Sequence, residues 1–371
     1  MKPTIYLALT HDWELRGDGS GDIDEIQFAP LQRLLEIYQR AGARTTFMPD
    51  VMQQIAFRSL EHEHPELKSL ADRWDEHVLA ARQSDHDIQL HLHSQWSDAR
   101  YQGGRWELHG PWSLLSYDAP AARQMIAGGN KYLEDLLRSF DQRYRCVAFR
   151  ASALALAPSA TLLTTLAELG IEIDVSMAAG FHLDNETLQL DYRTCKEGFL
   201  PYFPQMDDAR QVSKRSEPIV CVPLNHFYGS RRAVTRQNLF LARTRLQSRE
   251  TAKPTLRAQL DTQTMGFARV YEKLIEPMLK RKYFVSDTGR LNYELMREML
   301  ASIRKRAAAT GLAKVPVVLT NHPKDIRDWA GLEKFVMDLA GAEDVEFITL
   351  TDLARQLKAG ELEIRVDPRS R

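Results

Sequence analysis

Two short segments of this chain contain side chains suited to metal binding or proton transfer. In the first, LALTHDWELRGDG, Asp12 and Glu14 stand one residue apart at the end of an apolar run. Neighbouring carboxylates can take different roles, one held anionic by a cation and the other free to accept a proton. An ordinary turn is the alternative, because GDGSGD follows directly. His11 would alternate to the opposite face of the strand, so we expect it to be packed or to act as a cap.

The second segment, HDIQLHLHSQW, is predicted to be a strand. Side chains alternate along a strand, so His91 and His93 would share one face with Asp87 and Gln89. Imidazoles together with a carboxylate are ligands that zinc and other divalent first-row metals prefer. The alternative is a pair of solvated histidines at a strand end.

Three further polar residues follow apolar runs. Arg150 ends the run VAF, where an unpaired guanidinium would be costly, and Asp174 in IEIDVSM is the candidate partner. A purely structural ion pair is the alternative for these two residues. His322 ends VVLTNH and is followed by a proline, which stops the strand. A lone histidine at such a position usually has a structural role. Only the presence of the other candidate residues suggests a catalytic role for His322.

Short β-rich runs alternate with helical patterns along most of the chain, as in a parallel sheet or barrel wrapped by helices. Five of the strands end in a polar residue able to do chemistry, and active sites of parallel barrels form at these carboxyl ends. Helices are predicted over 28–41, with Gly42 as the stop, and over about 55–83 and 119–141. Strands are predicted at 4–9, RTTFM, HDIQLHLHSQW, CVAFR, IEIDVSM, VPVVLTNH and VEFITL.

Between residues 228 and 310 this alternation stops, and we expect a helical insertion without strands. Its first part is basic, and the local positive charge would attract an anionic substrate if it bordered a cleft. A solvated helix face is the alternative. The basic residues are Arg231, Arg232, Arg236, Arg243, Arg245, Arg249 and Lys253.

Composition limits the classes of function. The 371 residues are 44% hydrophobic and carry 49 Lys and Arg against 50 Asp and Glu, so no bulk charge favours nucleic acid. Cys146, Cys195 and Cys221 lie far apart, which argues against a disulfide framework or a thiolate zinc site. No apolar run approaches the ~20 residues of a membrane span, and the N-terminal run is too short for a signal peptide. We therefore expect a cytoplasmic protein.

Taken in order, these motifs resemble the polysaccharide deacetylase family, carbohydrate esterase family 4, also called the NodB homology domain. The resemblance covers residues 1 to about 227 and resumes at about 315–357. THDWE corresponds to the family motif TFDDG, which implies that Asp12 is the general base and Glu14 a metal ligand. HLHSQ corresponds to H-(S/T)-x-x-H, which makes His91 the first histidine ligand and places Gln95 at the second. His93 or the amide oxygen of Gln95 would then complete the site.

The later motifs match in part. RASA corresponds to RxPY, with Arg150 retained and the proline and tyrosine lost; the backbone N–H of Ala153 would bind the oxyanion. IEIDVSM resembles the segment whose aspartate orients that arginine, here Asp174. LTNHP resembles the motif whose histidine is the general acid, here His322.

The resemblance implies a single domain over 1–371, a distorted, incomplete (β/α) barrel of the NodB type with the 228–310 insertion. It implies a metal-dependent hydrolase that removes the acetyl group of an N-acetylated sugar, with zinc, nickel or cobalt as cofactor. The expected partner is a carbohydrate or sugar precursor, with no nucleic acid and no membrane span, and oligomers are possible. The alternatives are an allantoinase-like hydrolase of a small amide and a metal-free carbohydrate-binding barrel.

Overall fold

The fold is built around a long first strand. The computed structural model describes residues 2–185, 187–247 and 281–367. β1 (Thr4–Trp13) is parallel to both of its main neighbours in the first sheet, whose order is β16-β1-β2-β3, and β17 also pairs with β1. These partners are β2 (Thr46–Pro49), β3 (Asp87–Ile88), β16 (Lys314–Asn321) and β17 (Val345–Phe347).

A second parallel sheet continues the curve. Its order is β13-β8-β7-β4, formed by β4 (Leu90–Leu92), β7 (Ala148–Ala151), β8 (Ile173–Asp174) and β13 (Val220–Cys221). Single bridges join the two sheets, from Asp50 to His91 and from Leu224 to Val318. The strands therefore follow a barrel that is distorted and not closed by continuous ladders, as the family resemblance implied.

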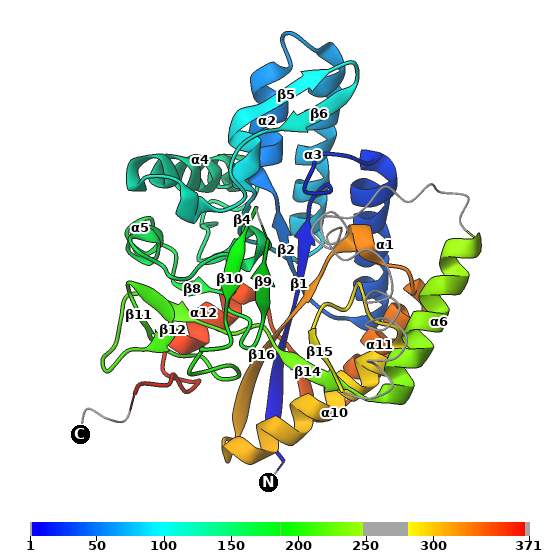
Figure 1. The fold of residues 1–371 in the computed structure, drawn as a ribbon, viewed down its shortest axis with the longest axis vertical. Helices are drawn as coiled ribbons and strands as arrows, with labels where there is room; N and C mark the ends of the chain where they lie inside the picture. Colours follow the sequence, from blue (N-terminus) through cyan, green and yellow to red (C-terminus); the bar gives the residue numbers. More distant parts are fainter. Residues whose placement is uncertain (1, 186, 248–280, 368–371) are drawn as a thin grey trace.

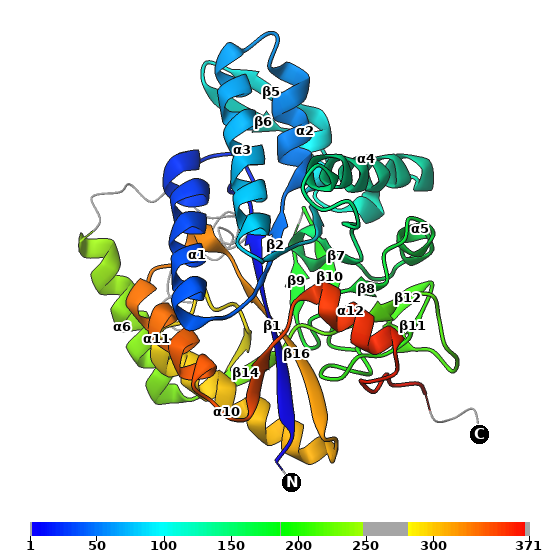
Figure 2. The same cartoon turned by 180° about the vertical axis from the view of Figure 1, so that it is seen from behind.

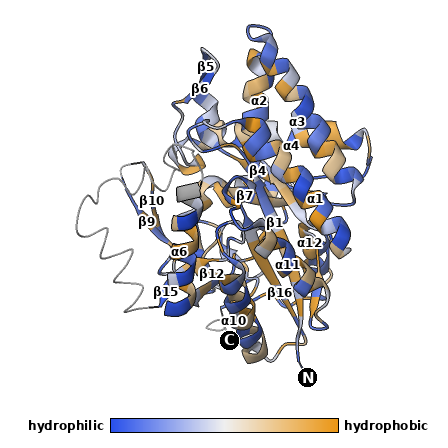
Figure 3. Cartoon of the chain, turned by 90° about the vertical axis from the view of Figure 1, so that its right-hand side faces the viewer, coloured by the Kyte–Doolittle hydropathy of each residue, from blue (hydrophilic) through white to orange (hydrophobic). Residues whose placement is uncertain are grey.

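Helices cover the outside of the two parallel sheets (Figure 1, and from behind in Figure 2), and β16 is mostly apolar (Figure 3). The predicted helix at 28–41 is confirmed and ends at Gly42, whose φ of 61° closes it. The helix predicted over 55–83 is two helices, separated at residues 61–64. The helices around the barrel are α1 (Ala29–Ala41), α2 (Val51–Leu60), α3 (Pro65–Gln83), α4 (Ala119–Arg138), α5 (Leu162–Glu168), α10 (Tyr293–Thr310), α11 (Trp329–Ala340) and α12 (Leu350–Lys358).

The loops contain small hairpins and short helices that were not predicted from the sequence. Antiparallel hairpins in the described residues are formed by β5 (Ala99–Gln102) and β6 (Arg105–Leu108), by β9 (His182–Asp184) and β10 (Gln189–Asp191), and by β11 (Pro204–Gln205) and β12 (Asp208–Val212). The short helices in the described part of the chain are η1 (Asp24–Phe28), η2 (Ser94–Asp98), η3 (Leu114–Ser116), η4 (Ser152–Leu154) and η6 (Pro323–Asp325). Among the described residues, no helix is long and apolar enough to cross a membrane.

The region 228–310 differs from the strand-free insertion that the sequence predicted. β14 (His226–Gly229) pairs antiparallel with β15 (Lys282–Val285), and between them α6 (Arg231–Gln247) begins. The strands were missed because the apolar residues of β15 are few and follow a basic run. In the basic stretch, Arg236 forms an ion pair with Glu294 of α10 at 2.8 Å. Arg249 and Lys253, and the side chain of Arg245, lie outside the described residues, so the role of this stretch stays a prediction.

His11 is packed in the core, as expected. Its ring stacks on Phe47 with centroids 4.9 Å apart and meets Tyr38 edge-on at 5.3 Å. Burial lowers the pKa of His11 to about 3, because an apolar surrounding disfavours the imidazolium.

Acid should therefore destabilise the fold through this residue. Between pH 6.5 and 3 the unfolded chain binds a proton at His11 that the folded chain does not, so stability falls as pH falls through this window. Relative to pH 7, the loss from one such group is about 2 kcal/mol at pH 5. The variant His11→Phe should show a smaller loss of unfolding free energy between pH 7 and pH 5. An identical pH dependence in urea unfolding of both proteins would contradict this assignment.

Candidate metal and proton-transfer site

The first candidate segment is placed by the end of β1. Asp12 pairs in register with Met48 of β2, and the neighbouring His11 pairs with Asn321 of β16. The carboxyl ends of these parallel strands therefore meet at one edge, where Asp12 and Glu14 are both buried. Asp12 and Glu14 therefore do not lie in an ordinary solvated turn, which was the alternative for this segment.

Glu14, His91 and His93 form one compact, buried group of ligand atoms. Oε2 of Glu14 lies 2.9 Å from Nε2 of His91 and 2.6 Å from Nε2 of His93. The ligand atoms of the three residues lie within 4.8 Å of one another. One carboxylate and two imidazoles suit zinc or a similar divalent ion, so the donor set fits a metal.

An outer contact orients His91 in the way that is usual for metal-binding histidines, and Asp50 holds the backbone of His93. Nδ1 of His91 lies 2.8 Å from the carbonyl oxygen of Arg150, which leaves Nε2 facing Glu14. The backbone N–H of His93 donates to Oδ1 of Asp50 at 3.1 Å, and Oδ2 of Asp50 lies 3.7 Å from Nδ1 of His93. Burial by itself would lower the pKa of His91. The hydrogen bond with Glu14 and the negative charges of Asp12, Glu14 and Asp50 outweigh this effect and raise the pKa to about 9.

Gln95 lies behind His93 and outside the ligand group. Its amide nitrogen contacts Nδ1 of His93 at 3.2 Å and the carbonyl oxygen of Gly17 at 3.3 Å. Oε1 of Gln95 and Oδ2 of Asp50 are buried without a hydrogen-bond partner, and both residues surround the ring nitrogen of His93 that faces away from Glu14. Of the two alternatives for the third ligand, the geometry favours His93, with Gln95 and Asp50 as the residues that orient it.

Metal binding should depend more strongly on His91 and His93 than on Gln95. We expect His91→Ala and His93→Ala to lose stoichiometric zinc, because each removes one of three donors, whereas Gln95→Ala keeps it with an affinity about 10–100-fold weaker, the usual effect of outer partners. Metal content by mass spectrometry after dialysis, and competition with a chelator, measure both quantities. Full metal in His93→Ala together with loss in Gln95→Ala would assign the third ligand to Gln95.

Arg150 is fully buried and pairs with Asp12. Nη1 of Arg150 donates to Oδ1 of Asp12 and, at 3.2 Å, to the hydroxyl of Thr320, while Nε donates to the carbonyl oxygen of Val175 at 3.2 Å. Burial raises the pKa of Asp12, but Arg150 and then His322 outweigh it and lower the pKa below its usual range. Asp12 is therefore held as a carboxylate.

The expected pairing of Arg150 with Asp174 is wrong. Asp174 instead accepts bonds from the backbone N–H and the hydroxyl of Ser176, at 2.9 and 2.7 Å. The Ser176 hydroxyl in turn accepts from the N–H of Ala151, next to Arg150. Burial raises the pKa of Asp174 to about 7, although the hydrogen bonds from Ser176 act to lower it. Asp174 thus supports the strand that carries Arg150 and does not touch its guanidinium.

His322 stands at the open side of the cluster. Its side chain is 21% exposed, whereas those of Asp12 and Glu14 are 4% exposed, so it is the member that solvent or a substrate reaches. Nε2 of His322 lies 3.5 Å from Asp12, and Nδ1 lies 2.8 Å from Oδ2 of Asp287. Burial lowers the pKa of His322, but Asp287 opposes this, and the pKa is raised above its usual value.

Sequence reasoning missed Asp287 and Lys324. Asp287 falls in the region read as a strand-free insertion, yet it bridges to Thr320 and so reaches His322. Lys324, two residues after His322, donates to Oε1 of Glu14 at 2.5 Å and to the carbonyl oxygen of Leu15 at 2.8 Å. The position of Lys324 directly after the late histidine motif was the only available signal.

The backbone after Arg150 adopts an unusual conformation. Ala153 and Leu154 have φ values of 48° and 63°, a region that residues other than glycine seldom adopt and that costs energy. Such strain persists where surrounding structure or function requires it. It occurs at Ala153, whose backbone N–H the family resemblance assigns to the oxyanion.

Comparisons with known proteins give fold likeness only. No family model and no curated protein matches the chain. Similar solved structures include one provisionally described as a polysaccharide deacetylase from Mycobacterium smegmatis (17% identity, 100% of this chain and 96% of that chain, TM-score 0.49). Puue allantoinase shows 12% identity over 96% of this chain and 91% of its own (TM-score 0.46). A 4-alpha-glucanotransferase from Thermococcus litoralis shows 10% identity over 98% of this chain and 41% of its own (TM-score 0.50).

Two of the similar solved structures are described as polysaccharide deacetylases. At identities below 25% the likeness concerns the fold alone.

Proposed function

We propose that this protein is a metal-dependent hydrolase that removes the acetyl group of an N-acetylated sugar. One observation carries the proposal. A carboxylate paired with a buried arginine, Asp12, lies within 3.5 Å of a partly exposed histidine, His322, beside the ligand group of Glu14, His91 and His93. A base, an acid and a cation site at one strand edge are the groups that amide hydrolysis needs.

The side chains would divide the work as follows. A divalent cation held by Glu14, His91 and His93 would supply a Lewis acid for the carbonyl and the attacking water. Asp12, kept anionic and oriented by Arg150, accepts the proton of that water. The N–H of Ala153 donates to the oxygen that becomes negative, and preorganised donors of this kind stabilise a tetrahedral intermediate.

The second proton transfer falls to His322. Cleavage of the amide C–N bond requires a proton on the leaving nitrogen, and Nε2 of His322 faces the cluster while Nδ1 is held by Asp287. The Asp287 carboxylate favours the imidazolium, the form that can donate. The same groups can hydrolyse a small amide, so allantoin is included as a substrate in the test below.

The proposal is tested by assaying purified protein, loaded with zinc, cobalt or nickel, for acetate release from N-acetylglucosamine oligomers and sugar precursors, and for allantoin hydrolysis. We expect acetate release that a chelator abolishes and added metal restores. His322→Ala should keep its metal and lose about 10²–10⁴-fold in kcat. Absence of acetate release with every metal and substrate, or activity only on allantoin, would reject the deacetylase assignment.

A further inference from the structure

Lys324 places a cation at the ligand group, although it has no part in the proposed proton transfers. Its Nζ donates to Oε1 of Glu14 at 2.5 Å and to the carbonyl oxygen of Leu15 at 2.8 Å, and its side chain is 10% exposed. β1 and β16 pair in register up to His11 and Asn321, so η6, which follows β16, brings Lys324 to the residues that follow β1. The pairing of these two strands therefore fixes the contact.

The two oxygens of Glu14 have different partners. Oε2 lies 2.9 Å from Nε2 of His91 and 2.6 Å from Nε2 of His93, so it is the oxygen that belongs to the ligand group. Oε1 accepts from Lys324 and lies 3.8 Å from Nε2 of His322, the partly exposed member of the site. Oε1 is therefore the oxygen on the side that a substrate reaches.

This division determines how many donor atoms Glu14 can give a cation. A carboxylate binds a metal ion through one of its oxygens or through both. Catalytic zinc sites have three protein ligands and leave the fourth position of a tetrahedron to water or substrate. Oε2 of Glu14 and the two imidazoles supply three donor atoms. If Oε1 joined them, it would occupy the position on the side of His322, where the attacking water has to bind.

An ion pair that serves only the fold is the alternative for Lys324. A buried ammonium is costly to desolvate, and its positive charge repels any cation bound beside it. A neutral side chain could fill the same space without either cost. The contact is therefore explained better by control of the Glu14 carboxylate than by stability of the fold.

We propose that Lys324 is a positioning residue that keeps Glu14 monodentate. By holding Oε1, it presents Oε2 alone to a divalent cation and keeps a coordination position open on the side of His322. The inference rests on the proposed metal-dependent function and adds to it the residue that keeps the cation site open. Lys324 acts through Glu14 and is not itself a catalytic residue.

The crystal structure of the zinc-loaded wild type is the direct test. We expect one oxygen of Glu14 at about 2.0–2.2 Å from zinc, the usual distance for a carboxylate ligand, and the other oxygen still on Nζ of Lys324. Both oxygens of Glu14 on zinc, or Lys324 displaced from Glu14, would overturn the proposal. Absence of zinc from the group of Glu14, His91 and His93 would overturn it as well.

Cobalt(II) spectra test the same property in solution, because four-coordinate cobalt absorbs visible light more strongly than five- or six-coordinate cobalt. In Lys324→Met, Oε1 is free to join the cation, so we expect a weaker absorption of the cobalt protein. We also expect zinc to bind at least about 10-fold tighter, because the variant adds a donor and removes a like charge. Chelator competition measures this affinity.

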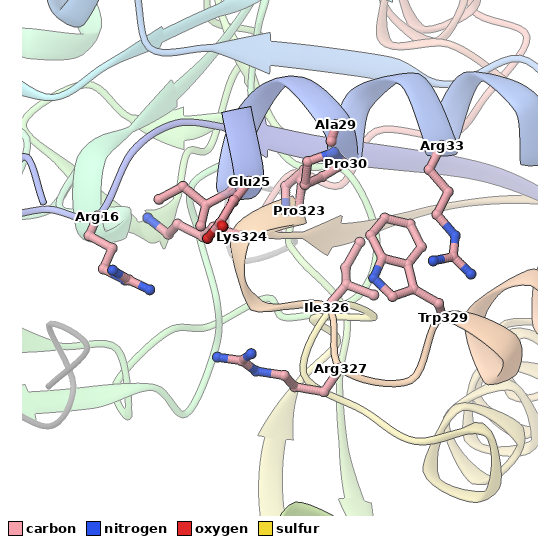
Figure 4. Close-up of a pocket in the computed structure, with 11 residues that line it drawn as sticks. Arg16, Glu25, Ala29, Pro30, Arg33, Pro323, Lys324, Ile326, Arg327 and Trp329 are labelled. Carbon is pink, nitrogen blue, oxygen red and sulfur yellow. The ribbon is translucent and has the colours of Figure 1, made fainter. Parts of the chain in front are cut away.

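Lys324→Arg is the conservative variant, since it keeps both the positive charge and the N–H donors. Lys324 also lines a cavity of about 300 Å³ (Figure 4), which has room for the longer side chain. We expect this variant to have the wild-type cobalt spectrum. Lys334→Met is the matched control, because it breaks an exposed ion pair with Asp338, whose side chains are 58% and 42% exposed, and should change neither spectrum nor affinity.

An unchanged cobalt spectrum in Lys324→Met, or weaker zinc binding, would show that Lys324 only supports the fold, and would overturn the proposal. None of these measurements needs turnover, so the inference and the proposed function can fail separately. A zinc protein with monodentate Glu14 that releases no acetate rejects the deacetylase assignment alone. Acetate release with both oxygens of Glu14 on zinc rejects this inference alone.

Discussion

Asp12→Asn is expected to lower kcat for acetate release by about 10²–10⁴-fold, the usual contribution of a general base. The asparagine keeps the size of the side chain and can still meet Arg150, but it cannot accept the proton of water. KM and metal content should change little, because the substitution leaves the three proposed ligands, Glu14, His91 and His93, in place. The measurement is steady-state kinetics with metal content determined on the same samples.

Thr320→Val is the matched control for this variant. The Thr320 hydroxyl contacts both Arg150 and Asp12, at 3.2 and 3.4 Å, so its loss disturbs the same hydrogen-bond network and leaves the carboxylate in place. We expect a much smaller fall in kcat than for Asp12→Asn. If Asp12→Asn retains near wild-type kcat with its full metal complement, Asp12 is not the base.

We expect Arg150→Met to lower the free energy of unfolding by about 3–5 kcal/mol at neutral pH, more than any other substitution proposed for this protein. The reason is that the variant leaves the Asp12 carboxylate buried without its partner. In the variant the pKa of Asp12 should rise above its unfolded value. The folded protein then binds the extra proton, so the deficit should shrink as pH falls from 8 to 5.

Urea unfolding at both pH values tests this expectation, with two companions. Arg150→Met/Asp12→Asn removes the buried charge as well and should recover part of the loss, which gives a coupling energy for the pair. Arg123→Met breaks an exposed ion pair with Glu168, whose side chains are 46% and 56% exposed, and should cost less than about 1 kcal/mol. A deficit in Arg150→Met no greater than in Arg123→Met would show that the buried pair has no structural role.

The residues of the candidate site were found from the sequence because each follows an apolar run that had to be a strand. Asp12, His91 and Arg150 lie at the carboxyl ends of β1, β4 and β7, and parallel strands bring such ends together whatever the loops between them do. Period-two alternation also placed His91 and His93 on one face. The sequence by itself therefore determined the parallel strands and the edge at which Asp12, His91 and Arg150 meet.

Which of these residues touch one another was decided only by the tertiary structure. Asp12 and Arg150 are 138 positions apart, and only the twist and order of the strands bring Asp12, and not Asp174, to the guanidinium. His93 and Gln95 both follow β4 within three residues, so the turn of the chain after β4 decides which of the two side chains faces Glu14.

The remaining members come from segments with no pattern of their own. Asp287 reaches His322 because residues around 286–288 bridge to β16, and Asp50 reaches His93 through an isolated bridge between the two sheets. Single bridges and loop contacts carry no periodic signal, because one or two residues are too short for hydrophobic alternation to mark them. Sequence periodicity specifies elements and their faces, whereas contacts between distant loops depend on how the packed elements close the barrel.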